Sequence, residues 1–209
     1  MGLSPIPAIA VILVLFSTRA KVNGPLFLTG WMAGLAILVT IVHLVADQLG
    51  AGAGGTTDEG ISWLRVLLGA VLLVAATRKW RHRPRPGGEP SVPAWMARIE
   101  GFAPAQALGV GLLLSSNPKN LALALGAGVS LAQLGVPPRQ AGAAIVVFVL
   151  VGSAAVIAAV VYALTGGAGA REHLEDTRTW LILHNGALMA ALYLVFGALL
   201  ISQGLGPRT

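Results

Sequence analysis

The sequence contains no cysteine and few charged side chains, which make up 11% of its 209 residues. Without cysteine the chain has no disulfide bond, no thiolate metal ligand and no cysteine nucleophile. The four histidines have no metal-ligand spacing, and no serine stands in a Gly-x-Ser-x-Gly turn. We therefore expect neither an enzyme nor a bound cofactor or metal.

Basic residues outnumber acidic ones, and the net charge is +6. In a soluble protein this charge would suggest a nucleic-acid partner. Here 56% of the residues are hydrophobic and the mean hydropathy is +0.79, which is typical of an integral membrane protein. Most Lys and Arg stand at the ends of apolar runs, where they orient helices in a bilayer. We therefore expect the partner to be a membrane and not a nucleic acid.

The apolar runs predict an all-α integral membrane protein with six transmembrane spans. A hydrocarbon core of about 30 Å requires about 20 helical residues. The run 103–134 is much longer than this and contains the sequence SSNPKN, so we expect two half-helices joined near Pro118. The other expected spans are 3–17, which is short, 25–46, 61–77, 141–164 and 180–202.

A basic, proline-rich loop at 81–102 divides the chain into two predicted three-helix repeats, 1–80 and 103–209. Most Lys and Arg near span ends fall on the side of this loop, which places it in the cytoplasm. Each half shows a proline break, an apolar half-helix and then a span rich in Gly and Ala. Because each half has an odd number of spans, the second is inverted relative to the first, the layout of many secondary transporters.

Two prolines, Pro5 and Pro7, begin the first apolar run almost at the start of the chain. In the second half an apolar half-helix precedes the proline break, whereas only residues 1–3 precede Ser4 in the first half. We therefore expect the first helix to be truncated, more readily by a late start codon than by a real loss, with Pro5 and Pro7 as the hinge. The alternative is that Pro5 merely occupies the first turn of a helix.

The break at SSNPKN is the strongest candidate for a substrate site. The N–H and C=O groups freed at a broken helix face protein, water or substrate, because lipid cannot bind them. Half-helix N-termini carry partial positive charge, and Lys119 adds a cation at a depth where insertion costs at least about 2.5 kcal/mol. We expect an anionic ligand group, a carboxylate or a phosphate. The expected substrate-binding residues are Ser4, Pro5, Pro7, Ser116, Asn117, Pro118, Lys119 and Asn120.

Each polar feature also has a structural interpretation. At the break, Ser116 and Asn117 would cap the second half-helix while Lys119 extends to the membrane surface. His43 and Asp47 stand four residues apart, as a hydrogen-bonded proton relay requires, but spans also often end in polar residues.

Small and aromatic residues give two further predictions. The stripe of Gly30 and Gly34 predicts close helix packing against a neighbour, either within the chain or in a homodimer. Four tryptophans near span ends fit an aromatic belt at the membrane interface: Trp31, Trp63, Trp80 and Trp180.

Two segments carry a family resemblance, residues 3–35 (LSPIPAIAVILVLFSTRAKVNGPLFLTGWMAGL) and residues 117–128 (NPKNLALALGAG). Over nearly its whole length the chain resembles the glycopeptidolipid-addressing protein family, also known as the sulfolipid-addressing proteins, of the lysine exporter superfamily. The resemblance implies a six-span transporter of the bacterial inner (plasma) membrane that moves envelope glycolipids to the cell surface. Family relatives export amino acids or cations. The chain departs from the family at its N-terminus, where members carry the first half of the first helix.

Three functions remain open from the sequence. The first is export of an anionic or glycosylated lipid by alternating access at the two proline breaks. The second is proton-coupled export of a small solute such as an amino acid, with His43 and Asp47 as the relay. The third is a non-transporting scaffold for lipid synthesis or export partners.

Overall fold

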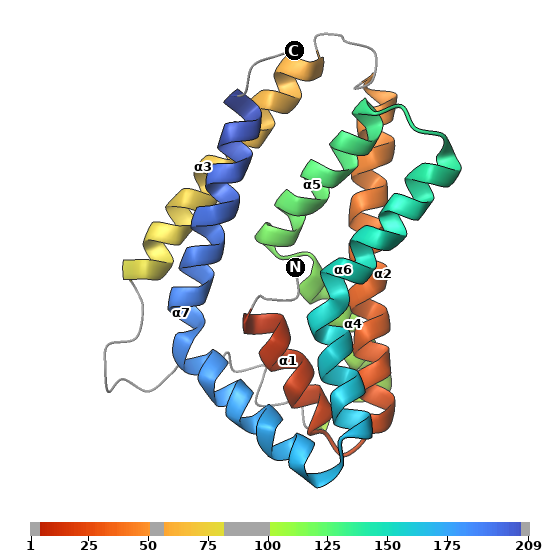
Figure 1. Cartoon of the computed structure of the whole chain (residues 1–209), viewed down its shortest axis with the longest axis vertical. Helices are drawn as coiled ribbons and strands as arrows, with labels where there is room; N and C mark the ends of the chain where they lie inside the picture. The colour runs from red at the N-terminus through yellow and green to blue at the C-terminus, as the bar shows by residue number, and fades with distance from the viewer. Residues whose placement is uncertain (1–4, 51–56, 82–100, 206–209) are drawn as a thin grey trace.

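The computed structural model describes residues 5–50, 57–81 and 101–205, which form helices and no strands (Figure 1). The helices are α1 (Pro5–Leu15), α2 (Ala20–Gln48), α3 (Thr57–Arg81), α4 (Pro104–Ser115), α5 (Pro118–Gln133), α6 (Pro138–Thr165) and α7 (Gly167–Leu205). The all-α prediction is therefore confirmed for these residues. Ser4, the expected truncation before it and nearly all of the 81–102 loop lie outside the described residues.

Proline marks the start of four helices. α1 begins at Pro5, and α4, α5 and α6 each carry proline at their first or second position. The fixed φ of proline suits the first helical turn, and its missing N–H removes no bond there. Pro5 therefore lies in the first turn of a helix, as the alternative to a hinge predicted.

Two helices begin well before the spans predicted within them. α2 begins at Ala20 and continues through Pro25, where the 25–46 span was expected to start. Proline there removes one backbone hydrogen bond close to the helix N-terminus, and the helix continues past it. α7 begins at Gly167 and not at residue 180. The charged residues that follow its first turn include an ion pair between Glu175 and Arg178, three residues apart, a spacing that supports a helix without an apolar run.

Three helices in the described residues are long and apolar enough to cross a membrane. They are α2, α6 and the Gly169–Ser202 part of α7. α4 and most of α1 are shorter apolar helices. The chain is therefore a membrane protein with apolar helices, whereas the count of six spans stays a prediction.

The helices form two groups that meet at α1 and where α5 and α6 contact α3 or α7. α2 packs against α4, α5 and α6, and α3 pairs with α7. Figure 1 shows that α2 and α6 run in opposite directions, as do α3 and α7. α1 contacts α7, α2, α6 and α4. It is buried on every side from Ile9 to Leu15, as expected for a helix that is hydrophobic all round.

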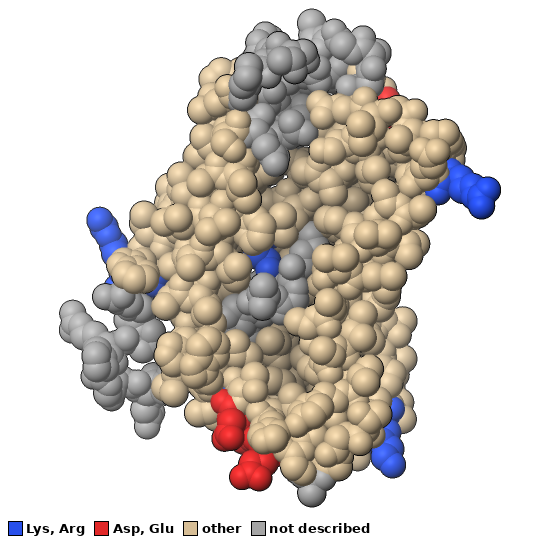
Figure 2. Space-filling model, viewed as in Figure 1, with Lys and Arg blue, Asp and Glu red and all other residues tan. Residues whose placement is uncertain are grey.

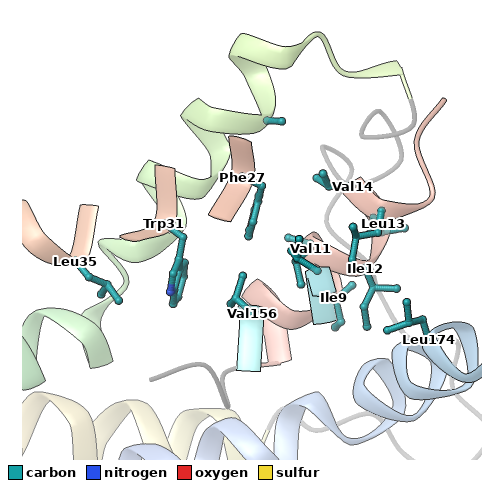
Figure 3. Close-up of a cluster of buried hydrophobic side chains, with 14 of the residues drawn as sticks. Ile9, Val11, Ile12, Leu13, Val14, Phe27, Trp31, Leu35, Val156 and Leu174 are labelled. Atoms are coloured by element: carbon teal, nitrogen blue, oxygen red, sulfur yellow. The ribbon is translucent and has the colours of Figure 1, made fainter. Parts of the chain in front are cut away.

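The main buried cluster lies around α1. Figure 3 shows Val11 beside Phe27 of α2 and Val156 of α6, with Ile12 towards Leu174 of α7. Van der Waals packing of this kind is the main source of helix association in a membrane, where lipid is as apolar as the side chains. The cluster fixes α1 against both helix groups.

The glycine stripe packs within the chain. A Cβ on Gly30 would overlap the carbonyl oxygen of Leu108 on α4, and a Cβ on Gly34 would overlap the hydroxyl of Ser115. In return, a Cβ on Gly111 of α4 would overlap the carbonyl oxygen of Phe27. The neighbour of the stripe is therefore α4, so the stripe gives no support for a homodimer.

The aromatic-belt prediction is wrong for Trp31. Its side chain is 0% exposed and belongs to the main buried cluster. Trp63, Trp80 and Trp180 are more than half exposed, as an interface position requires. Sequence distance from a span end gives the depth of a residue but not the helix face on which it lies, and Trp31 lies on the inner face.

Candidate substrate site at the helix break

The predicted break in the 103–134 run is confirmed. α4 ends at Ser115 and α5 begins at Pro118. Between them, the Oδ1 atom of Asn117 accepts a hydrogen bond from the backbone N–H of Asn120 (3.1 Å), which makes Asn117 the N-cap of α5. Its Nδ2 atom donates to the carbonyl of Leu114 (3.0 Å), so one side chain satisfies backbone groups of both half-helices.

Replacing Asn117 with alanine removes both bonds. Loss of an N-cap costs about 0.5–2 kcal/mol, so we expect Asn117→Ala to lower the thermal unfolding temperature of the protein in detergent micelles. Asn117→Ser keeps a capping oxygen and should recover most of the loss. Equal unfolding temperatures for the wild type and both variants would contradict the cap.

Lys119 and Asn120 are enclosed in the first turn of α5, with 1% and 0% of their surfaces exposed. The Lys119 ammonium lies 5.8 Å from the centre of the Phe196 ring on α7, within cation–π range. The Nδ2 atom of Asn120 donates to the Ser115 carbonyl (3.0 Å), and its Oδ1 atom is buried without a hydrogen-bond partner. The alternative in which Lys119 extends to the membrane surface is therefore contradicted.

The other predicted residues of this site are placed differently. Ser116 and Pro118 are exposed at the break, and Pro7 is buried within α1. Figure 1 shows α1 and α5 both beginning near mid-height and running in opposite directions. The N-terminal ends of these two short helices, with their partial positive charges, thus lie at a similar level of the molecule. In the space-filling view, Figure 2 shows basic atoms at the bottom of a hollow near the same level.

The expected pair of His43 and Asp47 forms no hydrogen bond in the described part of the chain. The Nδ1 atom of His43 is buried without a partner, and Asp47 is exposed. The backbone of His43 packs against Gly128 of α5, where a Cβ would lie 2.9 Å from the His43 nitrogen. Both residues lie on α2 at the expected four-residue spacing, but their side chains do not form the hydrogen bond that a direct relay requires. The proton relay therefore stays a prediction.

Sequence reasoning did not predict the surroundings of three polar or aromatic side chains. Phe196 lies against Lys119 from far along the chain. Trp31 on α2 and Ser153 on α6 are both 0% exposed, and the Trp31 Nε1 and Ser153 Oγ atoms have no hydrogen-bond partner among the described residues. A lone serine in the apolar segment VGSAAV was the available signal for Ser153.

These features define a class of protein: an all-α membrane protein with a buried cation at an interrupted apolar helix. The family model of Sap, the sulfolipid-1-addressing protein, matches residues 1–206. The chain therefore belongs to the sulfolipid-addressing protein family, and the resemblance to that family is confirmed. Neither a search of curated proteins nor a search of solved structures found a match.

Proposed function

We propose that this protein is a transporter of the bacterial inner membrane that helps export an anionic envelope lipid, such as a glycolipid, by alternating access. It acts without enzymatic chemistry or a cofactor. The name of its family, which refers to addressing a sulfolipid, supports a lipid substrate. The bilayer and the transported lipid are then its principal partners, with no role for nucleic acid.

The observation that carries this proposal is the burial of Lys119 at the interrupted helix. Charged residues at membrane depth are costly and usually belong to substrate or ion pathways. The ammonium and the N-terminus of α5 both favour an anion, and α1 begins at a similar level in Figure 1. A sulfate, phosphate or carboxylate head group has a charge opposite to that of Lys119.

An inverted-repeat architecture, as in the lysine exporter superfamily, is part of the proposal. In this arrangement α1, α2 and α3 are the counterparts of α5, α6 and α7. The contact between α3 and α7 is reciprocal: a Cβ on Gly69 would lie 2.7 Å from the Gly197 carbonyl oxygen, and one on Gly197 would lie 2.9 Å from that of Gly69. Both glycines stand in similar segments, VLLGAVLL and LVFGALLI. Such a pair is expected on a pseudo-twofold axis between repeats.

Gene deletion followed by complementation tests the proposed function. The quantities to compare are surface-extractable lipid, total lipid and secreted amino acids. We expect one anionic lipid to stay inside the deletion strain at unchanged total synthesis, and to return to the surface with the full gene. A lower total synthesis would favour the scaffold for lipid synthesis partners instead. Unchanged lipids with an amino acid retained in the cytoplasm would favour the small-solute exporter.

The second candidate, a proton-coupled solute exporter, draws support from the unpartnered Nδ1 atom of His43. Our proposal expects His43→Gln and Asp47→Asn to leave the surface fraction of the lipid unchanged, because neither side chain lies at the break. The same lipid extraction measures this. Loss of amino-acid secretion in both variants, with normal lipid export, would favour the second candidate over the first.

A further inference from the structure

A cavity lies between α5, α6 and α7, close to the helix break. Its volume is about 300 Å³. Ser130 is the one polar side chain in its lining. The rest of the lining is aliphatic or aromatic, including Ala122, Leu123, Ala127, Phe148 and Phe196. A largely apolar cavity of this kind offers few hydrogen bonds to a sugar or an amino acid.

The cavity is linked to Lys119 through Phe196. The Phe196 ring that lines the cavity is the ring beneath the Lys119 ammonium, 5.8 Å from its centre. Ala122, also in the lining, follows Lys119 by three residues on the same helix and so lies on nearly the same face. A buried cation and an apolar cavity are thus adjacent and share one aromatic side chain.

The cavity is open at the protein surface. Ser130 on α5 and Leu199 on α7 line it and are both exposed. α7 is apolar enough to cross a membrane over Gly169–Ser202, a range that includes Leu199. We take the opening beside this residue to face the hydrocarbon of the bilayer, which would give lipids access to the cavity.

We propose that this cavity holds part of an acyl chain of the substrate while the anionic head group of the same molecule lies at Lys119. This inference rests on the proposed function and gives the acyl chain of the substrate a place in the fold. Charge complementarity gives the orientation, with the head group at the buried cation and the chain in the largely apolar cavity on the other side of Phe196. One molecule of liquid water occupies about 30 Å³. A cavity of about 300 Å³ is therefore too small for a whole lipid but accommodates a segment of one chain.

A matched pair of glycine variants tests the cavity. A Cβ on Gly126, which lines the cavity on α5, would meet no atom within 4 Å, so Gly126→Leu should fill the cavity without displacing backbone. Gly142 on α6 is equally open but is not in the lining, and Gly142→Leu is its control. The probe is phosphatidic acid with a photoreactive diazirine in mid-chain, added to purified protein in phosphatidylcholine nanodiscs.

We expect mass spectrometry to locate the wild-type crosslinks on α5 and α7 around Leu123 and Phe196. Labelling there should fall several-fold in Gly126→Leu and persist in Gly142→Leu. In the wild type, the phosphatidic acid probe should label the cavity more strongly than a phosphatidylcholine probe. In Lys119→Met this difference in labelling should disappear. Equal labelling in both glycine variants, or labelling confined to the exposed face of α6 at Val146 and Val147, would overturn the inference.

The crosslinking experiment can fail or succeed independently of the gene-deletion experiment that tests the proposed function. If crosslinks miss the cavity while gene deletion still retains lipid inside the cell, the acyl-chain assignment is wrong and lipid export stands. If the cavity is labelled as expected while gene deletion leaves surface lipid unchanged, the cavity binds lipid and the export function is wrong.

Discussion

Lys119→Ala is expected to abolish export of the anionic lipid while the protein still accumulates in the membrane. The side chain is 1% exposed, and its ammonium is the cation beside the N-terminus of α5. Removing it takes away the charge that attracts the head group at membrane depth, where electrostatic interactions are weakly screened. The measurement is the surface-extractable fraction of the lipid, with protein abundance in the membrane determined in parallel.

Two further variants separate charge from packing. Lys119→Met keeps an unbranched side chain of similar length but no charge, and it should fail as completely as alanine. Lys79→Ala removes an exposed lysine near the end of α3 and should export normally. Normal export by Lys119→Met would show that export does not need the cation at the break, and it would contradict the proposed site.

Gly111→Ala is expected to destabilise the protein strongly, because the added Cβ would overlap the Phe27 carbonyl oxygen on α2. Overpacking costs about 1–3 kcal/mol when side chains can adjust. Here the obstacle is backbone, so the cost should lie at or above the upper end of that range. Thermal unfolding in detergent micelles measures it.

Gly109→Ala is the matched control for this prediction. Gly109 stands on the same helix, two residues earlier, and a Cβ there would meet no atom within 4 Å. Its unfolding temperature should equal or exceed that of the wild type, because alanine favours helix over glycine. If both alanine variants unfold at the same temperature, the close contact between α2 and α4 is not as described.

Local chemistry made the helix break predictable from sequence. Asn-Pro-Lys within a long apolar run combines a capping side chain with a proline suited to the first turn, and α5 begins at Pro118 as expected. The start of α7 was not predictable in the same way. Its first turn is Gly-Ala-Gly-Ala and charged residues follow at 171–178, whereas apolar length alone defined the expected span at 180–202.

Features that depend on helix faces and on distant contacts were harder to predict. Trp31 was assigned to the membrane interface because it stands near a span end, whereas it is buried in the main cluster with residues of α1, α4 and α6. Phe196 reaches Lys119 only through the tertiary arrangement of α5 and α7, so no local pattern connects them. The partner of the Gly30 stripe was likewise undetermined, because one helix face does not specify what covers it.

The most direct test of lipid export is a pulse-chase experiment that separates transport from synthesis. Cells are given a short pulse of labelled lipid precursor, further incorporation is stopped, and the labelled anionic lipid is followed from the inner membrane to the surface extract. We predict that label reaches the surface in cells with the full gene and stays in the inner membrane without it, at equal total label. Label that reaches the surface at the same rate in both strains would contradict the account.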